Sequence, residues 1–97
     1  MEGYVITMKE QEGNKVETAI LGVFENKEDA WHLLFEFYNT NEGKFEKQSL
    51  NQFENSEGAW VMELVGRKGD VTRTIRGEYI ADTKKVTSLR KLIEFNW

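Results

Sequence analysis

A fifteen-residue segment in the first half of the chain, Asn26–Thr40, constrains the fold more than any other stretch. It contains no proline or glycine and no β-branched residue before Thr40, and its apolar residues recur at the spacing of an α-helix. At about 100° per residue, one broad face collects five of them: Ala30, Trp31, Leu34, Phe37 and Tyr38. A helix with so wide an apolar face requires a large partner surface, and the simplest one is the face of a β-sheet.

The same segment predicts how the helix begins and ends. The side-chain oxygen of Asn26 can accept an amide hydrogen of the first turn, and Asp29 occupies the capping-box position three residues later. Gly43 predicts a left-handed end of the helix. Leu33 and Phe35 lie at the two margins of the apolar face. This face is therefore wider than one sheet covers, and a second helix or a second molecule is expected to cover the rest.

One domain covering residues 1–97 is expected, because 97 residues are enough for one hydrophobic core and too few for two. Aromatic residues make up 12% of the chain and supply much of the surface that it can bury. The chain contains no cysteine, which excludes disulfides and thiolate metal sites. Neither a signal peptide nor a membrane span is predicted from the distribution of apolar residues. These features are typical of a cytosolic protein.

Strands are predicted on both sides of the helix. In four of them apolar residues alternate or gather in short runs, whereas Lys44–Leu50 shows no clean period and is the weakest of the predictions. The predicted strands are Tyr4–Met8, Val16–Phe24, Lys44–Leu50, Ala59–Val65 and Val71–Ile80. The second of these has apolar groups on both faces, which suggests a central position in the sheet, and Gly22 within it indicates a bulge or a close approach of the helix. Gly66–Asp70 is predicted to be the last hairpin loop. Arg73 follows on the inward face of the last strand and is expected near the sheet margin or paired.

A last helix is predicted from Asp82 or Thr83 to about Phe95. Its apolar stripe, at helical spacing, comprises Val86, Leu89, Ile93 and Trp97. The complete order is then β-β-α-β-β-β-α. The most economical architecture is an α+β domain in which an antiparallel sheet of four to five strands carries the helices on one face.

The two parts of the chain differ in charge, although the whole has a net charge of −4. Residues 1–66 contain thirteen acidic residues and five lysines, whereas residues 67–97 contain eight basic residues and four acidic ones. Strands that interleave in space would mix these charges over the surface. A bipolar surface would instead favour binding to a partner or to a second copy. The mixed surface is the simpler explanation.

His32 is the single histidine, and it shares the polar side of the helix with Asp29 and Glu36. Imidazole and carboxylate groups at this spacing can bind a divalent metal or exchange a proton. One helix does not complete a coordination sphere, however, and an amphipathic helix needs a solvated polar side in any case. No serine lies in a nucleophile motif, and Gly66–Gly69 lacks the spacing of a Walker loop. We therefore expect no enzyme, no metal site and no cofactor.

The expected function is binding to another protein in a regulatory or inhibitory role, in the manner of a phage inhibitor of a host enzyme or defence system. The alternative is a nucleic-acid or small anionic-ligand binding domain that uses the basic last third of the chain, although a sequence pI near 5.0 disfavours it. A homodimer is also expected if Phe35 or Trp97 is exposed. The candidate partner-binding residues are Phe35, His32, Glu36, Arg67, Lys68, Arg76, Lys84, Lys85, Arg90, Lys91 and Trp97.

Overall fold

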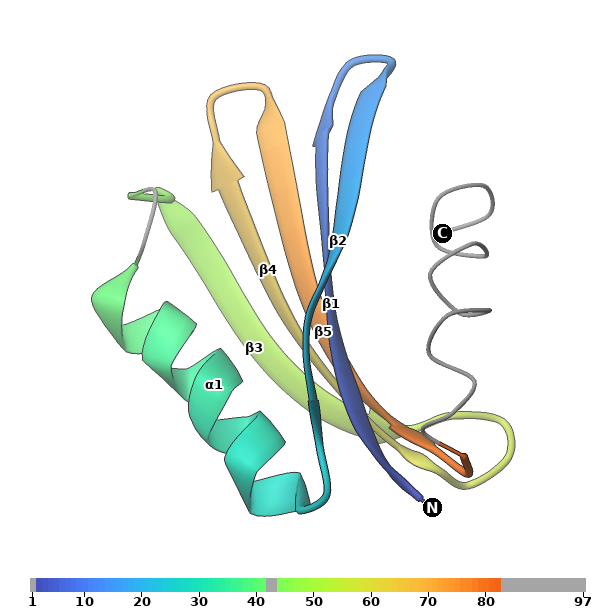
Figure 1. Cartoon of the computed structure of the whole chain (residues 1–97). Helices are drawn as coiled ribbons and strands as arrows, with labels where there is room; N and C mark the ends of the chain where they lie inside the picture. Colours follow the sequence, from blue (N-terminus) through green and yellow to red (C-terminus); the bar gives the residue numbers. More distant parts are fainter. Residues whose placement is uncertain (1, 42–43, 83–97) are drawn as a thin grey trace.

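The computed structural model describes residues 2–41 and 44–82, which form a small, sheet-rich domain (Figure 1). Its elements are β1 (Gly3–Glu12), β2 (Lys15–Phe24), α1 (Lys27–Thr40), β3 (Lys47–Glu54), β4 (Trp60–Lys68) and β5 (Val71–Ile80). The strands form one antiparallel sheet in the order β2-β1-β5-β4-β3. The predicted antiparallel sheet is thereby confirmed, with five strands.

The predicted order with two helices is not matched. The described part of the chain contains one helix, α1, so the label α+β fits this sheet-rich domain only loosely. The second helix, predicted to end near Phe95, lies outside the described residues. Within the described ranges, no helix is long and apolar enough to cross a membrane.

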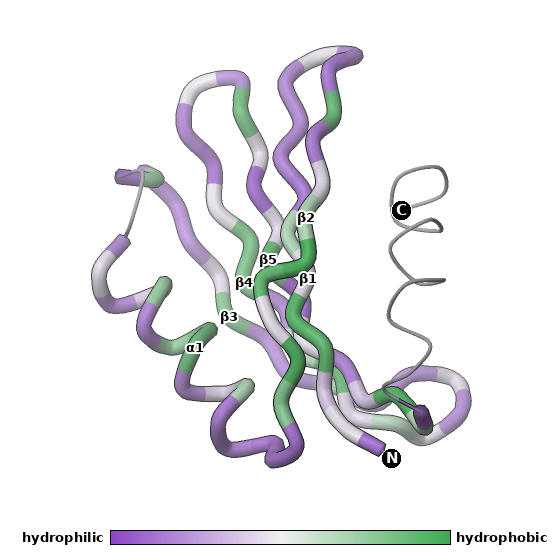
Figure 2. The backbone as a smooth tube through the Cα atoms, in the orientation of Figure 1, coloured by the Kyte–Doolittle hydropathy of each residue, from purple (hydrophilic) through white to green (hydrophobic). Residues whose placement is uncertain are grey.

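The core lies between α1 and one face of the sheet. Its fully buried members come from the helix and from three strands: Ile6, Ala30, Leu34, Met62, Leu64 and Ile75. Gly77 lets the helix approach, because a Cβ atom there would lie 2.8 Å from the Ile6 side chain and 3.4 Å from that of Leu34. Figure 2 shows hydrophobic stretches of the strands alongside α1 and largely hydrophilic hairpin ends beyond it.

β2 is an edge strand, so the predicted central position is wrong; the central strand is β5. The prediction assumed that apolar groups on both faces of a strand are both buried. On β2 one face remains exposed, with Val16 48% exposed and Val23 41% exposed. The predicted bulge is confirmed. Gly22 pairs with Ile6 while Ile20 pairs with the next residue of β1, which leaves Leu21 as the extra residue.

Arg73 lies on the inward face of the sheet, as predicted, and is 6% exposed. Of the two environments predicted for it, the sheet margin is wrong, because β5 is the central strand, whereas its side chain does have partners. Its guanidinium carbon lies 4.1 Å from the ring centroid of Phe45 and 5.5 Å from that of Phe37. Gly66 of β4 pairs with Arg73, and a Cβ atom at Gly66 would lie 3.0 Å from the Phe45 ring. Because Gly66 has no side chain, the Phe45 ring fits beside it and stacks on the guanidinium group of Arg73.

Several boundaries differ from the sequence expectation. Asn26 precedes α1 but makes no capping hydrogen bond to the backbone; its Nδ2 donates to Asp29 Oδ2 at 3.4 Å. The helix ends at Asn41 in a left-handed conformation, with φ 46°, and the predicted Gly43 lies outside the described residues. The Asn41 side chain also exchanges two hydrogen bonds of 2.9 Å with the backbone of Phe45. β3 begins at Lys47 and not at Lys44, and it continues to Glu54.

The predicted loop Gly66–Asp70 is shorter than expected. β4 continues to Lys68 and β5 starts at Val71, so the turn consists of Gly69 and Asp70 alone. Gly69 has a φ of 57°, a conformation that glycine adopts without steric cost.

Candidate functional site

The solvent-facing side of α1 carries a row of three aromatic rings, Trp31, Phe35 and Tyr38, which we call the aromatic ladder. The ring centroids of Trp31 and Phe35 are 5.8 Å apart, and those of Phe35 and Tyr38 are 6.1 Å apart. Trp31 is half-buried and packs against the core. Phe35 is 41% exposed and Tyr38 is 39% exposed. The ladder therefore runs from the core outward to solvent.

A surface hollow of about 540 Å³ lies beside this ladder, lined in part by Trp31 and Phe35. Its polar lining consists of His32, Glu36, Asn39 and Thr40. These residues recur every three or four positions, so a single helix places all of them along one side. Imidazole, carboxylate, amide and hydroxyl groups around an apolar floor can orient a partner by hydrogen bonds while the rings supply apolar contact.

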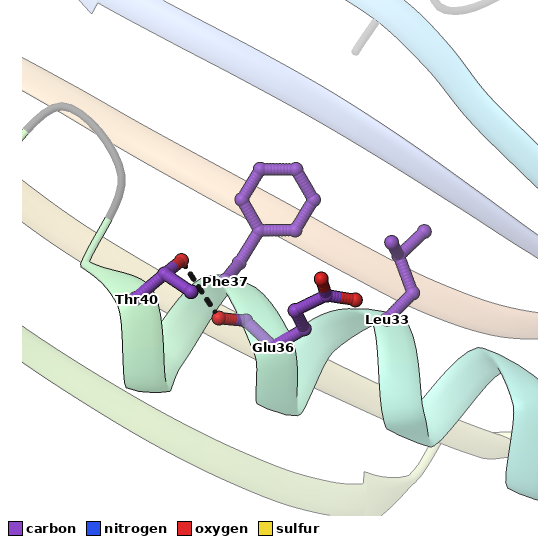
Figure 3. A pocket seen from close by; sticks show the side chains of 4 residues that line it. All are labelled: Leu33, Glu36, Phe37 and Thr40. Atoms are coloured by element: carbon purple, nitrogen blue, oxygen red, sulfur yellow. Dashed lines mark hydrogen bonds between the residues drawn. The ribbon is translucent and has the colours of Figure 1, made fainter.

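A second hollow of about 430 Å³ borders the opposite margin of α1. Leu33 and Phe37 project from the same side of the helix, and Glu36 and Thr40 line its polar part (Figure 3). The Thr40 hydroxyl donates a 2.8 Å hydrogen bond to the Glu36 carbonyl oxygen and so keeps its methyl group in a defined place. Glu36 and Thr40 belong to both hollows, which makes them the ridge between the two.

The charge of this surface is mainly acidic. Glu28, Asp29 and Glu36 are exposed on α1, and Lys27 is its single basic residue. The Lys27 ammonium group is directed toward the sheet side, 5.9 Å from the centroid of the Trp60 ring. A partner that approaches α1 therefore meets apolar rings bordered by negative charge.

The structure brings together three of the predicted site residues. His32, Phe35 and Glu36 are exposed on α1 and line one hollow. Sequence reasoning did not select Tyr38 for this site, because its helical position assigned it to the buried face. Tyr38 lies at the edge of that face, where a side chain with a polar end often stays in contact with water.

The predicted basic residues are dispersed. Arg67 and Lys68 are exposed at the end of β4. Arg76 lies on the sheet face opposite α1, with its guanidinium nitrogens 3.7 Å from a Glu63 carboxylate oxygen and 4.0 Å from one of Glu78. The remaining members lie outside the described residues: Lys84, Lys85, Arg90, Lys91 and Trp97.

A clear pKa shift among the described groups occurs away from α1, at the end of β5. The Tyr79 hydroxyl donates a 2.7 Å hydrogen bond to Glu2 Oε2, and this bond raises the pKa of Tyr79 above its ordinary value. Ionisation there would place two negative charges side by side. The Tyr79 ring also meets Tyr4 edge-on at 5.8 Å, so the shifted group belongs to an aromatic cluster on the sheet.

No group of three or more histidine and carboxylate side chains is arranged to hold a metal ion within residues 2–41 and 44–82. No protein-family model matches the chain, and neither a curated protein nor a solved structure matches it. The candidate site is therefore defined by the geometry and chemistry of its residues alone.

Proposed function

We propose that the chain binds another protein through the solvent-facing side of α1, in a regulatory or inhibitory role and without catalysis. The observation that carries this proposal is the exposure of two neighbouring rings, Phe35 and Tyr38, in contact with each other on one helix. Large aromatic side chains dominate the binding energy of many protein interfaces, because each covers a large area with few rotatable bonds.

The packing of α1 supports this role. Ala30 and Leu34, on the inner side of the helix, have no exposed surface. Gly77 of β5 lies directly beneath Leu34 and allows close contact. A helix held in this way presents its outer rings with little further loss of conformational entropy on binding.

The chemistry of the surface indicates the kind of partner. The ladder and its hollow require an apolar groove or protruding apolar side chains, and the carboxylates of Glu28 and Glu36 require lysine or arginine around them. We therefore expect a partner with an apolar contact area bordered by basic residues. Such a complex buries about 1,200–2,000 Å² in total if it is a stable one of standard size.

The test uses three tagged forms of the full chain: the wild type, the double variant Phe35→Ala/Tyr38→Ala, and Phe53→Ala as the matched control. Phe53 is 43% exposed on β3, close to the 41% of Phe35, but lies on the sheet face opposite α1. Proteins captured from a lysate by each form are identified by mass spectrometry. The partner is then purified and its affinity for each form is measured by calorimetry.

The expected result is a partner that the wild type and Phe53→Ala bind equally and that the double variant binds at least about tenfold more weakly, which corresponds to about 1.4 kcal/mol. Replacing Glu36 by lysine should also lower the affinity for the partner. This loss of affinity should be larger at low salt than at high salt, because salt screens the charge at position 36. Equal affinity of all three forms for the partner, or capture of nucleic acid in place of protein, contradicts the proposal.

A further inference from the structure

The sheet face opposite α1 carries an apolar row that crosses all five strands. The strand register places Val23, Val5, Glu78, Val61 and Phe53 side by side, in that order, from β2 to β3. Four of these five residues are apolar, and Glu78 stands in the middle. We call this set the valine row. It lies toward the end of β5, two residues before Ile80.

The exposure along this row is uneven. Val5 and Val61 have no exposed surface, whereas Val23 and Phe53 at the two ends are 41% and 43% exposed. Neighbouring side chains in a sheet shield a valine from the sides but leave its methyl groups open above the sheet. Complete burial of Val5 and Val61 therefore requires a cover over the middle of the row. Among the described elements, α1 packs on the other face, so it does not supply that cover.

The chain itself supplies a segment of the required length at the required place. β5 is the central strand, and its last residue, Ile80, points to the same face as the valine row because it alternates with Tyr79. Residues 83–97 follow almost directly. Fifteen residues in a helix extend about 22 Å, and five strands are about 19 Å wide from first to last. The segment is therefore long enough to cross the row.

The composition of that segment complements the face. Its apolar stripe, Val86, Leu89, Ile93 and Trp97, matches the valines in chemistry. Its basic residues, among them Lys85 and Arg90, match the carboxylates of Glu63 and Glu78, whose side chains are each 28% exposed on this face.

We propose that residues 83–97 dock on the valine row of their own chain as an amphipathic helix and form the third layer of the domain. This occupant differs from the partner proposed for α1, because the two surfaces lie on opposite sides of the sheet. The basic residues of the segment then serve an intramolecular interface, and their charges are directed to Glu63 and Glu78.

The test is a methyl NMR experiment on the full chain with labelled valine, leucine and isoleucine side chains. Nuclear Overhauser contacts are expected between the methyl groups of Val5 or Val61 and those of Leu89 or Ile93. A sample that mixes labelled and unlabelled copies distinguishes contacts within one chain from contacts between two. Contacts within one chain support the proposal. Contacts between chains only, which would make a second copy the occupant, overturn it.

A matched pair of variants provides a second measurement. Leu89→Asp replaces a member of the apolar stripe, and Ser88→Asp places the same charge on the opposite side of the predicted helix. Leu89→Asp should shift the Val5 and Val61 methyl signals and increase the binding of a hydrophobic dye severalfold, whereas Ser88→Asp should change neither. Equal behaviour of the two variants overturns the proposal and assigns the cover to the side chains of Glu78 and Arg76 instead.

Discussion

The two sides of this molecule expose aromatic and aliphatic residues in opposite ways. On α1, Trp31 is half-buried while Phe35 and Tyr38 reach into solvent next to each other. On the far face of the sheet, Val5 and Val61 in the middle of the valine row are buried and only its ends are open. The surface of a helix is convex, so residues past the margin of its buried face stay accessible, whereas residues on a sheet face are buried wherever another segment packs over them. The exposed Phe35 on α1 is therefore a candidate contact for a partner, whereas the exposed Phe53 marks the uncovered end of the valine row.

The largest effect expected from this comparison is on the valine row. Val61→Asp should lower the free energy of unfolding by about 4 kcal/mol, because it replaces a fully buried methyl pair by a carboxylate without a partner. Phe53→Asp, one strand away in the same row, should lower it by less than about 1 kcal/mol, since Phe53 is 43% exposed. Chemical denaturation measures both. Similar losses in the two variants would mean that the middle of the row is not covered.

A smaller effect is expected within α1, between its inner and outer sides. Leu34→Ala should cost about 3 kcal/mol in unfolding free energy, because Leu34 is fully buried against Ile6 and Gly77 and leaves a cavity. Phe35→Ala should cost less than about 1 kcal/mol while it weakens partner binding. Denaturation curves of the two variants give the comparison. A loss at Phe35 as large as that at Leu34 would show that the ladder serves stability.

The ion pairs on the sheet face opposite α1 should contribute less to the unfolding free energy than Leu34 does. Glu63→Gln removes one partner of Arg76, at 3.7 Å, from side chains that are 28% and 32% exposed. Solvent screening limits the expected loss to about 0.5 kcal/mol in unfolding free energy. The same denaturation assay in low and high salt checks it, since the difference from the wild type should shrink as salt rises. A loss above about 2 kcal/mol would place Glu63 in a much drier environment than its exposure indicates.

The smallest effect concerns Tyr79 and depends on pH. Its folded-state pKa is raised by the hydrogen bond to Glu2, so the folded chain holds the phenolic proton more tightly than the unfolded chain. The resulting stability is complete below the unfolded pKa near 10 and is lost as pH rises through the folded pKa. An NMR titration of the Tyr79 ring should show a lower pKa in Glu2→Gln. An unchanged titration in that variant would exclude Glu2 as the cause.

Sequence reasoning predicted the local elements better than their neighbours in space. The apolar period of α1 and the alternation of Val71–Ile80 depend on residues a few positions apart, so they can be read along the chain. The candidate site residues His32, Phe35 and Glu36 were selected for the same reason. The edge position of β2 and the stacked environment of Arg73 depend on which distant strands pair, and no local pattern encodes that.

The spacing of apolar residues was thus enough to predict the helix, its two sides and the strands around it, because helix and strand periodicity is a property of the backbone over a few residues. The fold alone established which of these surfaces meet. Long-range pairing places Val23, Val5, Val61 and Phe53 in one row, although they are far apart along the chain. Tyr38 is 39% exposed despite its position on the apolar side of α1. The cylindrical surface of the helix turns away from the sheet at the margin of the buried face, where Tyr38 lies.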